Sequence, residues 1–142
     1  MYEVFEHTAD LGLRVRAGSL EQLLAEAARA LFSTLVVNLD AVRYVQEKTY
    51  QIAGKEADYL LFDWLTELLY TFETEHLLLV HFDVRVNDAG LEATCHGEPL
   101  DRQRHELDHE VKAITYHGLT VRPPCGPPGS GGFWEAEVIV DI

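Results

Sequence analysis

The chain has 142 residues, of which 47% are hydrophobic, so it is long enough to bury a core and too apolar to be disordered. Its 24 acidic and 11 basic residues give a formal net charge of −13, and such a surface repels phosphate backbones. Direct nucleic-acid binding is therefore not expected, whereas metal binding or docking on a basic protein suits this charge. We expect a single domain over residues 1–142.

The amino terminus and the two cysteines bear on location. Residues 1–6 have neither the basic region nor the apolar core of a signal peptide, and no apolar run is long enough to span a bilayer. Cys95 and Cys125 have no paired spacing, which predicts free thiols in a reducing compartment, with a bridge between them as the alternative. We expect a cytoplasmic protein without membrane contact.

Apolar periodicity predicts two helices and three strands in the first part of the chain. Ser19 with Gln22 matches a capping box and predicts that the first helix begins there. Its apolar residues repeat at helical spacing as far as Leu35. The second helix is predicted over residues 57–74, with Trp64 on its buried side. The strands are predicted at residues 2–6, 11–16 and 42–52.

The second part of the chain is predicted to consist of strands and turns. Asn87-Asp88-Ala89-Gly90 accepts positive φ and predicts a hairpin between residues 78–86 and 91–96. Another strand pair is predicted at residues 110–116 and 119–122, and a last strand follows the Pro/Gly-rich loop, residues 123–132. We therefore expect an α+β fold, an antiparallel-rich β-sheet structure with two main helices and roughly seven strands.

The two ends of the chain carry the main functional clue. Near the start stands Glu6-His7-Thr8-Ala9-Asp10, and the last two residues are Asp141 and Ile142. A strand that runs to the terminus places the Asp141 side chain beside the α-carboxylate of Ile142. If Asp10 lies next to them, three acidic groups converge, and such a cluster is costly unless a cation or a proton neutralises it. The ends therefore raise metal binding as the first functional question, and His7 is a candidate neighbour.

Two other features have competing interpretations. His105-Glu106-Leu107-Asp108-His109 fits the H-E-x-x-H pattern of zinc hydrolases, in which two histidines share a helix face and the glutamate activates water. Loop-like sequence before it and strand-like sequence after it argue against a helix. Lys112 lies in a predicted strand, where a solvated lysine is the simpler interpretation. The alternative is a cation that reaches the acidic ends, a nucleotide or a partner.

Several segments, in order along the whole chain, resemble the archease family far more specifically than any short motif. These segments are Glu6–Leu13, Asp63–Tyr70, Gly97–Asp101, His105–Leu107, Glu110–Leu119 and Val138–Ile142. His109 falls at a variable position of the family pattern, and Pro123–Gly132 looks like a local insertion.

The resemblance implies a non-enzymatic accessory protein. Archeases assist the GTP-dependent tRNA-splicing RNA ligase, which joins RNA ends through a guanylylated histidine of its own. The implied role is to promote ligase guanylylation and multiple turnover in tRNA splicing and RNA repair. A zinc hydrolase using His105, Glu106 and His109, and a chaperone-like interaction module, are the alternatives.

The resemblance also assigns residues. It implies a divalent cation, calcium first with magnesium or manganese as alternatives, held by Asp10, Asp141 and the carboxylate of Ile142. Oxygen-only ligands suit these metals better than zinc. It reverses the simpler interpretation of Lys112, which matches a lysine important for activation. His7 and Glu98 are further candidates for the activator function.

Overall fold

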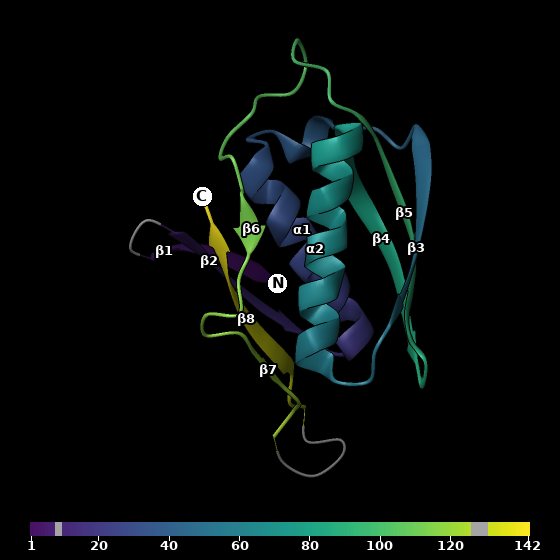
Figure 1. The fold of residues 1–142 in the computed structure, drawn as a ribbon, viewed down its shortest axis with the longest axis vertical. Helices are drawn as coiled ribbons and strands as arrows, with labels where there is room; N and C mark the ends of the chain where they lie inside the picture. Colours follow the sequence, from purple (N-terminus) through teal and green to yellow (C-terminus); the bar gives the residue numbers. More distant parts are fainter. Residues whose placement is uncertain (8–9, 126–130) are drawn as a thin grey trace.

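The computed structural model describes residues 1–7, 10–125 and 131–142, and within these residues two antiparallel sheets enclose two helices (Figure 1). The helices are α1 (Leu20–Leu35) and α2 (Ala57–Glu75), and Leu39–Ala41 forms a 3₁₀ turn. The strands are β1 (Tyr2–His7), β2 (Asp10–Ala17), β3 (Gln46–Ala53), β4 (Leu77–Asn87), β5 (Gly90–Pro99), β6 (Ala113–Ile114), β7 (Thr120–Arg122) and β8 (Trp134–Asp141). The predicted α+β class is confirmed.

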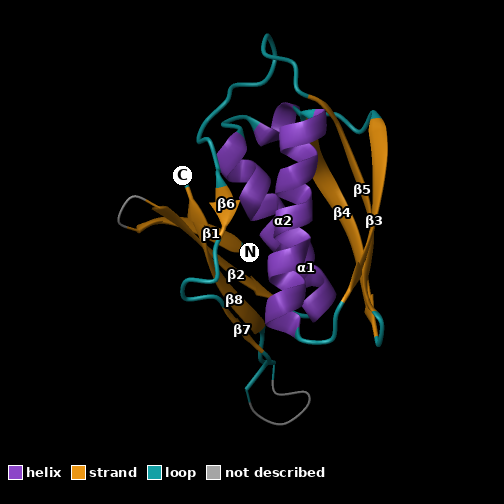
Figure 2. Cartoon of the chain, in the orientation of Figure 1, coloured by secondary structure: helices purple, strands orange, loops and turns teal. Residues whose placement is uncertain are grey.

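The sheets form the two outer layers. One has the strand order β1-β2-β8-β6, with β7 also paired to β8, and the other has the order β3-β5-β4. Figure 2 shows the helices between them. No helix of the described residues is long and apolar enough to cross a membrane.

Helix α1 begins where the capping motif predicts. The Ser19 side chain accepts a hydrogen bond from the Gln22 backbone N–H at 3.1 Å, which satisfies one of the free donors of the first turn. The helix contacts β2 of one sheet and β4 of the other, so it is apolar on two sides. Its fully buried Phe32 stacks on Phe82 of β4 with ring centroids 5.9 Å apart. Helix α1 therefore joins the two sheets through one core.

Helix α2 is fixed to this core by Trp64, which is fully buried. The indole Nε1–H donates to the backbone oxygen of Leu24 in α1 at 2.9 Å, so burial leaves no indole donor unpaired. The Tyr50 ring of β3 meets the indole edge-on, with centroids 5.4 Å apart. Helix α2 ends at His76, whose N–H donates to the Phe72 oxygen and whose left-handed conformation (φ 53°) turns the chain out of the helix.

Three predicted strands differ from the structure. The strand expected from residue 42 begins at Gln46, because the 3₁₀ turn and an irregular segment precede it. Residues 110–116 and 119–122 form no hairpin with each other. The short strands β6 and β7 instead pair separately with the same edge of β8. The segment between them turns toward α2, where Tyr116 stacks on Phe62 with centroids 3.8 Å apart.

Candidate functional site

One row of residues crosses four strands at one end of the five-stranded sheet. We call it the acidic row, and it consists of His7, Asp10, Asp141 and Ala113. The register pairs His7 with Asp10, Asp10 with Asp141, and Asp141 with Ala113. The backbone N–H of Lys112 donates to the Asp141 carbonyl oxygen at 2.7 Å. The structure therefore brings together three segments that are far apart in the sequence, and four of the residues named from the sequence lie on neighbouring backbone positions.

Asp10 and Asp141 occupy the outer face of this sheet. Residues directly opposite on antiparallel strands point to the same side, with Cβ atoms roughly 5 Å apart. The next pair along the strands, Leu11 and Val140, is buried against the helices, so the aspartates point away from them. Both aspartates are half-buried. Two carboxylates are thus held side by side on a rigid part of the fold.

Ile142 extends this acidic pair. Its side chain is partly buried against the core, which holds the backbone of residue 142 beside Asp141 at the end of β8. Among the described residues, no three His, Cys, Asp or Glu side chains come together as a metal site. Two aspartates plus an α-carboxylate at residue 142 would supply three oxygen donors, a set that fits calcium, magnesium or manganese. The residues present therefore fit the implied cation.

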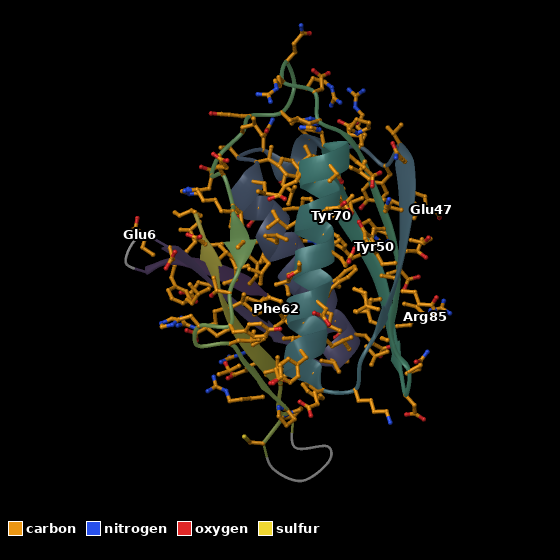
Figure 3. The ribbon with its side chains drawn as sticks, in the orientation of Figure 1. Glu6, Glu47, Tyr50, Phe62, Tyr70 and Arg85 are labelled. Carbon is orange, nitrogen blue, oxygen red and sulfur yellow. The ribbon has the colours of Figure 1, made fainter. Side chains whose placement is uncertain are left out.

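Among the described residues, the charges around the pair give Asp141 no ion-pair partner. Arg14, farther along the same face, is shared between Glu3 and Glu137 at 3.5 Å from each. No ion pair among the described residues includes the Asp141 carboxylate or the exposed Lys112 ammonium. Figure 3 shows a further carboxylate, Glu6, at this end of the sheet. A cation bound by Asp141 would therefore displace no ion-pair partner in the described part of the chain.

Next to the acidic row, on the same outer face of the sheet, lies a row of apolar residues. Gly12 lies opposite Phe5 on β1, and a Cβ at Gly12 would lie 2.0 Å from the Phe5 ring. The absence of a side chain there lets the ring lie flat across β2. Ile139, which pairs with Gly12, is 5% exposed although it faces outward. This packing fixes the strand ends that carry the aspartates.

Glu98 lies apart from the acidic row, at the end of β5 in the other sheet. It is 3% exposed and pairs with Arg104 and with His105, whose Nε2 lies 2.7 Å from Glu98 Oε1, off the direction of an ideal hydrogen bond. Burial alone would raise the pKa of Glu98, but the Arg104 hydrogen bond and charge, helped by His105, hold it below its usual value. Glu98 therefore anchors the loop after β5.

The H-E-x-x-H segment has no helical geometry. Residues 105–109 run alongside the end of α1, and the backbone N–H groups of Asp108 and His109 donate to carbonyl oxygens of Leu35 and Thr34. His105 Nδ1 accepts a hydrogen bond from the Asp101 N–H at 2.9 Å, and its Nε2 faces Glu98. The Nδ1 lone pair of His105 is thus used by a backbone hydrogen bond and its ring is buried, whereas His109 is exposed. The arrangement that a zinc hydrolase requires is not present in these residues.

Sequence reasoning did not find Arg104, although this residue and Asn38 hold the loop in place. Arg104 pairs with Glu98 inside the fold, and its backbone oxygen accepts from the Asn38 side chain at 2.8 Å. The same Asn38 side chain accepts from the Glu106 N–H at 2.8 Å. The one signal in the sequence was Glu98 within the segment Gly97–Asp101, because a glutamate that is buried requires a cationic partner nearby.

Comparisons with known proteins agree with this fold over the whole chain. A model of the Archease protein family (MTH1598/TM1083) matches residues 2–142. The protein archease of Methanopyrus kandleri is 39% identical over 145 residues, covering 99% of both chains, and that of Pyrococcus abyssi is 34% identical, covering 99% of this chain and 98% of its own.

Two solved structures are also similar. The solution structure of Methanobacterium thermoautotrophicum protein 1598 has a TM-score of 0.81 at 32% identity, covering 99% of this chain and 98% of its own. The crystal structure of a Thermotoga maritima protein, described as an archease and possible chaperone, has a TM-score of 0.65 at 22% identity, covering 100% and 98%. The second likeness concerns the fold alone.

Proposed function

The chain belongs to the archease family, and from this premise we propose that it is a metal-binding activator of the GTP-dependent tRNA-splicing RNA ligase. Its role is to promote guanylylation and multiple turnover of the ligase, and it acts as an accessory protein rather than an enzyme. The ligase as partner comes from the family resemblance. The observation that carries the proposal for this chain is the register that sets Asp10 beside Asp141, with the backbone of Lys112, just before β6, bonded to the Asp141 carbonyl oxygen.

In this proposal Asp10, Asp141 and the α-carboxylate of Ile142 hold one divalent cation, with calcium first and magnesium or manganese as alternatives. The cation supplies the positive charge that offsets the repulsion among three neighbouring carboxylates. The support is chemical, because all three donors are oxygens and Asp141 has no ion-pair partner among the described residues.

The acidic end of the sheet is then the surface that meets the ligase. A net charge of −13 favours approach to a basic protein surface, and a ligase that binds RNA must present one. Lys112 is exposed and its backbone lies next to that of Asp141, so one partner surface could meet both a cationic and an anionic group here. His7, on the backbone row with Asp10, is a further candidate for this contact.

A guanylylation assay with the ligase and GTP tests the proposal. We expect Asp10→Ala, Asp141→Ala and Lys112→Ala each to lose at least about tenfold of the stimulation, the scale of one lost charged contact. Asp83→Ala and Lys55→Ala are matched controls, because both residues are charged and lie outside the acidic row. Unchanged stimulation by all three site variants would contradict the proposal.

Metal titration separates the ligand set from the alternatives. Calcium should bind to the wild-type protein at one ion per chain, more weakly to Asp141→Ala, and more weakly when a short Gly-Ser tag follows Ile142. Equal binding by the tagged chain would remove Ile142 from the set. Stoichiometric zinc that His105→Ala abolishes would favour the hydrolase. Metal binding that has no effect on ligase stimulation, together with protection of an unrelated client from aggregation, would favour a chaperone-like module.

A further inference from the structure

A polar groove of about 580 Å³ runs between α2 and β3, far from the acidic row. Residues Lys48–Ala53 of β3 form one side, and exposed side chains of α2, among them Asp63, Glu67 and Tyr70, form the other. Figure 3 labels Tyr50 and Tyr70 on these two elements, and Figure 1 places β3 on the opposite side of the molecule from the carboxyl terminus.

Strand β3 offers an unpaired backbone edge to this groove. Within the described residues it pairs with β5 alone. The Gly54 N–H donates to the Ala89 oxygen at 3.2 Å in continuation of this ladder, and hydrogen-bonded positions alternate along an antiparallel strand. By this alternation, counted back from Gly54, the backbone N–H and C=O groups of Thr49, Gln51 and Ala53 point away from β5. None of the hydrogen bonds found among the described residues uses them.

The common features that keep such an edge from pairing are weak here. β3 has eight residues, contains no proline, and keeps one register with β5 throughout. Lys48 is the one charged residue on the inward side of the strand, a feature that can oppose strand addition. Its Nζ lies 2.7 Å from Glu75 Oε2, so this charge is already paired at the end of the groove. The remaining edge is open to another strand.

The opposite wall selects for positive charge. Asp63 and Glu67 are one helical turn apart on α2, both are exposed, and no ion pair among the described residues includes either of them. Like charges at this spacing destabilise a helix, so a cation between them is favourable. Tyr70, one turn further along, is 61% exposed and can cover the stem of a lysine or arginine.

We propose that this groove binds an extended, basic segment of a partner protein, which adds to the free edge of β3 as a fourth strand of the β3-β5-β4 sheet. Alternate residues of the segment place lysine or arginine side chains against Asp63 and Glu67, while its backbone pairs with Thr49 and Gln51. A second copy of this chain fits less well, because it would bring its own acidic α2 wall to the contact. The inference does not depend on the proposed metal site.

A labelled peptide tests both parts of the inference. The probe is a fluorescein-labelled octapeptide in which lysine alternates with valine, and its anisotropy is measured with the full-length protein. We expect saturable binding that weakens with salt, and no binding of the matched peptide with glutamate in place of lysine. N-methylation of one alternate set of backbone nitrogens should weaken binding at least about tenfold, while the other set should change it less than about threefold, because only one set faces β3. Equal effects of both sets would overturn strand addition.

Variants of the protein give the complementary test. Asp63→Asn with Glu67→Gln should weaken peptide binding about tenfold, the scale of two exposed ion pairs. Asp40→Asn with Asp88→Asn removes the same charge away from the groove and should leave binding unchanged. Undiminished binding by the first pair, or an equal loss with the second, would overturn the inference. Self-association in sedimentation velocity that the peptide abolishes would overturn it in favour of a second copy of the chain.

Discussion

The paired carboxylates at the end of β2 and β8 predict that Asp141→Asn has opposite effects with and without metal. Asp10 and Asp141 face one another across two strands, with Cβ atoms about 5 Å apart. At that distance two unit charges screened as in bulk water repel by roughly 1 kcal/mol, the lower end of the range for a pair near a protein surface. Asparagine keeps the shape of aspartate and removes one charge. We therefore expect the metal-free variant to be about 1 kcal/mol more stable than the wild-type protein.

Calcium should reverse this order. An ion that binds only the folded protein, at one hundred times its dissociation constant, raises the free energy of unfolding by about 2.7 kcal/mol. The wild-type protein should gain this amount, whereas Asp141→Asn, with one ligand neutralised, should gain little. With calcium the variant is then less stable by roughly 2 kcal/mol. At about 3 °C per kcal/mol for a chain of this length, the melting temperature of the wild-type protein rises by roughly 8 °C.

Urea denaturation of the wild-type protein and of Asp141→Asn, each in EDTA and in calcium, measures the four free energies of unfolding. Asp83→Asn is the matched control, since it removes one exposed strand carboxylate from the other sheet and should leave the gain from calcium intact. Equal gains from calcium for the wild-type protein and Asp141→Asn would refute the ligand assignment. A metal-free Asp141→Asn variant that is clearly less stable than the wild-type protein would refute the repulsion on which the magnitude rests.

Three further outcomes follow from residues outside the acidic row. Because the folded pKa of Glu98 lies below its usual value, the ionised Glu98 carboxylate stabilises the fold fully above about pH 4.3, and this contribution is lost as the pH falls through the folded pKa. Glu98→Gln should lower the free energy of unfolding by roughly 3 kcal/mol at pH 7. In urea titrations from pH 7 to 3, the variant should also lose less stability with acid than the wild-type protein. Gly97→Ala should cost about 3 kcal/mol or more in thermal unfolding, since its Cβ would lie 1.7 Å from the Leu78 backbone oxygen. Burial raises the pKa of the Cys95 thiol to about 12, so a thiol reagent at pH 8 should modify exposed Cys125 quickly and Cys95 only on unfolding.

The elements that the sequence predicted well are those with local causes. Ser19 forms the predicted cap, and the turn at Asn87–Gly90 joins β4 to β5 as expected, with the Asn87 side chain accepting from the Ala89 N–H at 2.8 Å. The caps, turns and apolar stripes involve residues within a few positions of each other, so their pattern is readable in one sequence. Cys95 and Cys125 are thiols rather than a disulfide-bonded pair, as predicted.

What the sequence did not predict depends on contacts between distant residues. β6 and β7 looked like a hairpin because both have strand-like composition, but β8 offers each a longer partner. The Phe62–Tyr116 stack then draws the intervening segment onto α2. The partner of Glu98 was equally hidden, because Arg104 reaches it through a loop whose path depends on Asn38.

The position of Asp141 in the sheet, and not only its charge, bears on how tightly it can bind a metal ion. The end of a strand frays unless neighbouring elements hold it. Here β8 is an inner strand, and at Asp141 it is paired on one side with Asp10 and on the other with Ala113, while the Lys112 N–H donates to its carbonyl oxygen. A ligand set placed on such a strand loses little conformational entropy when it binds. Weakening the β6 contact should therefore reduce metal affinity even though β6 supplies no ligand.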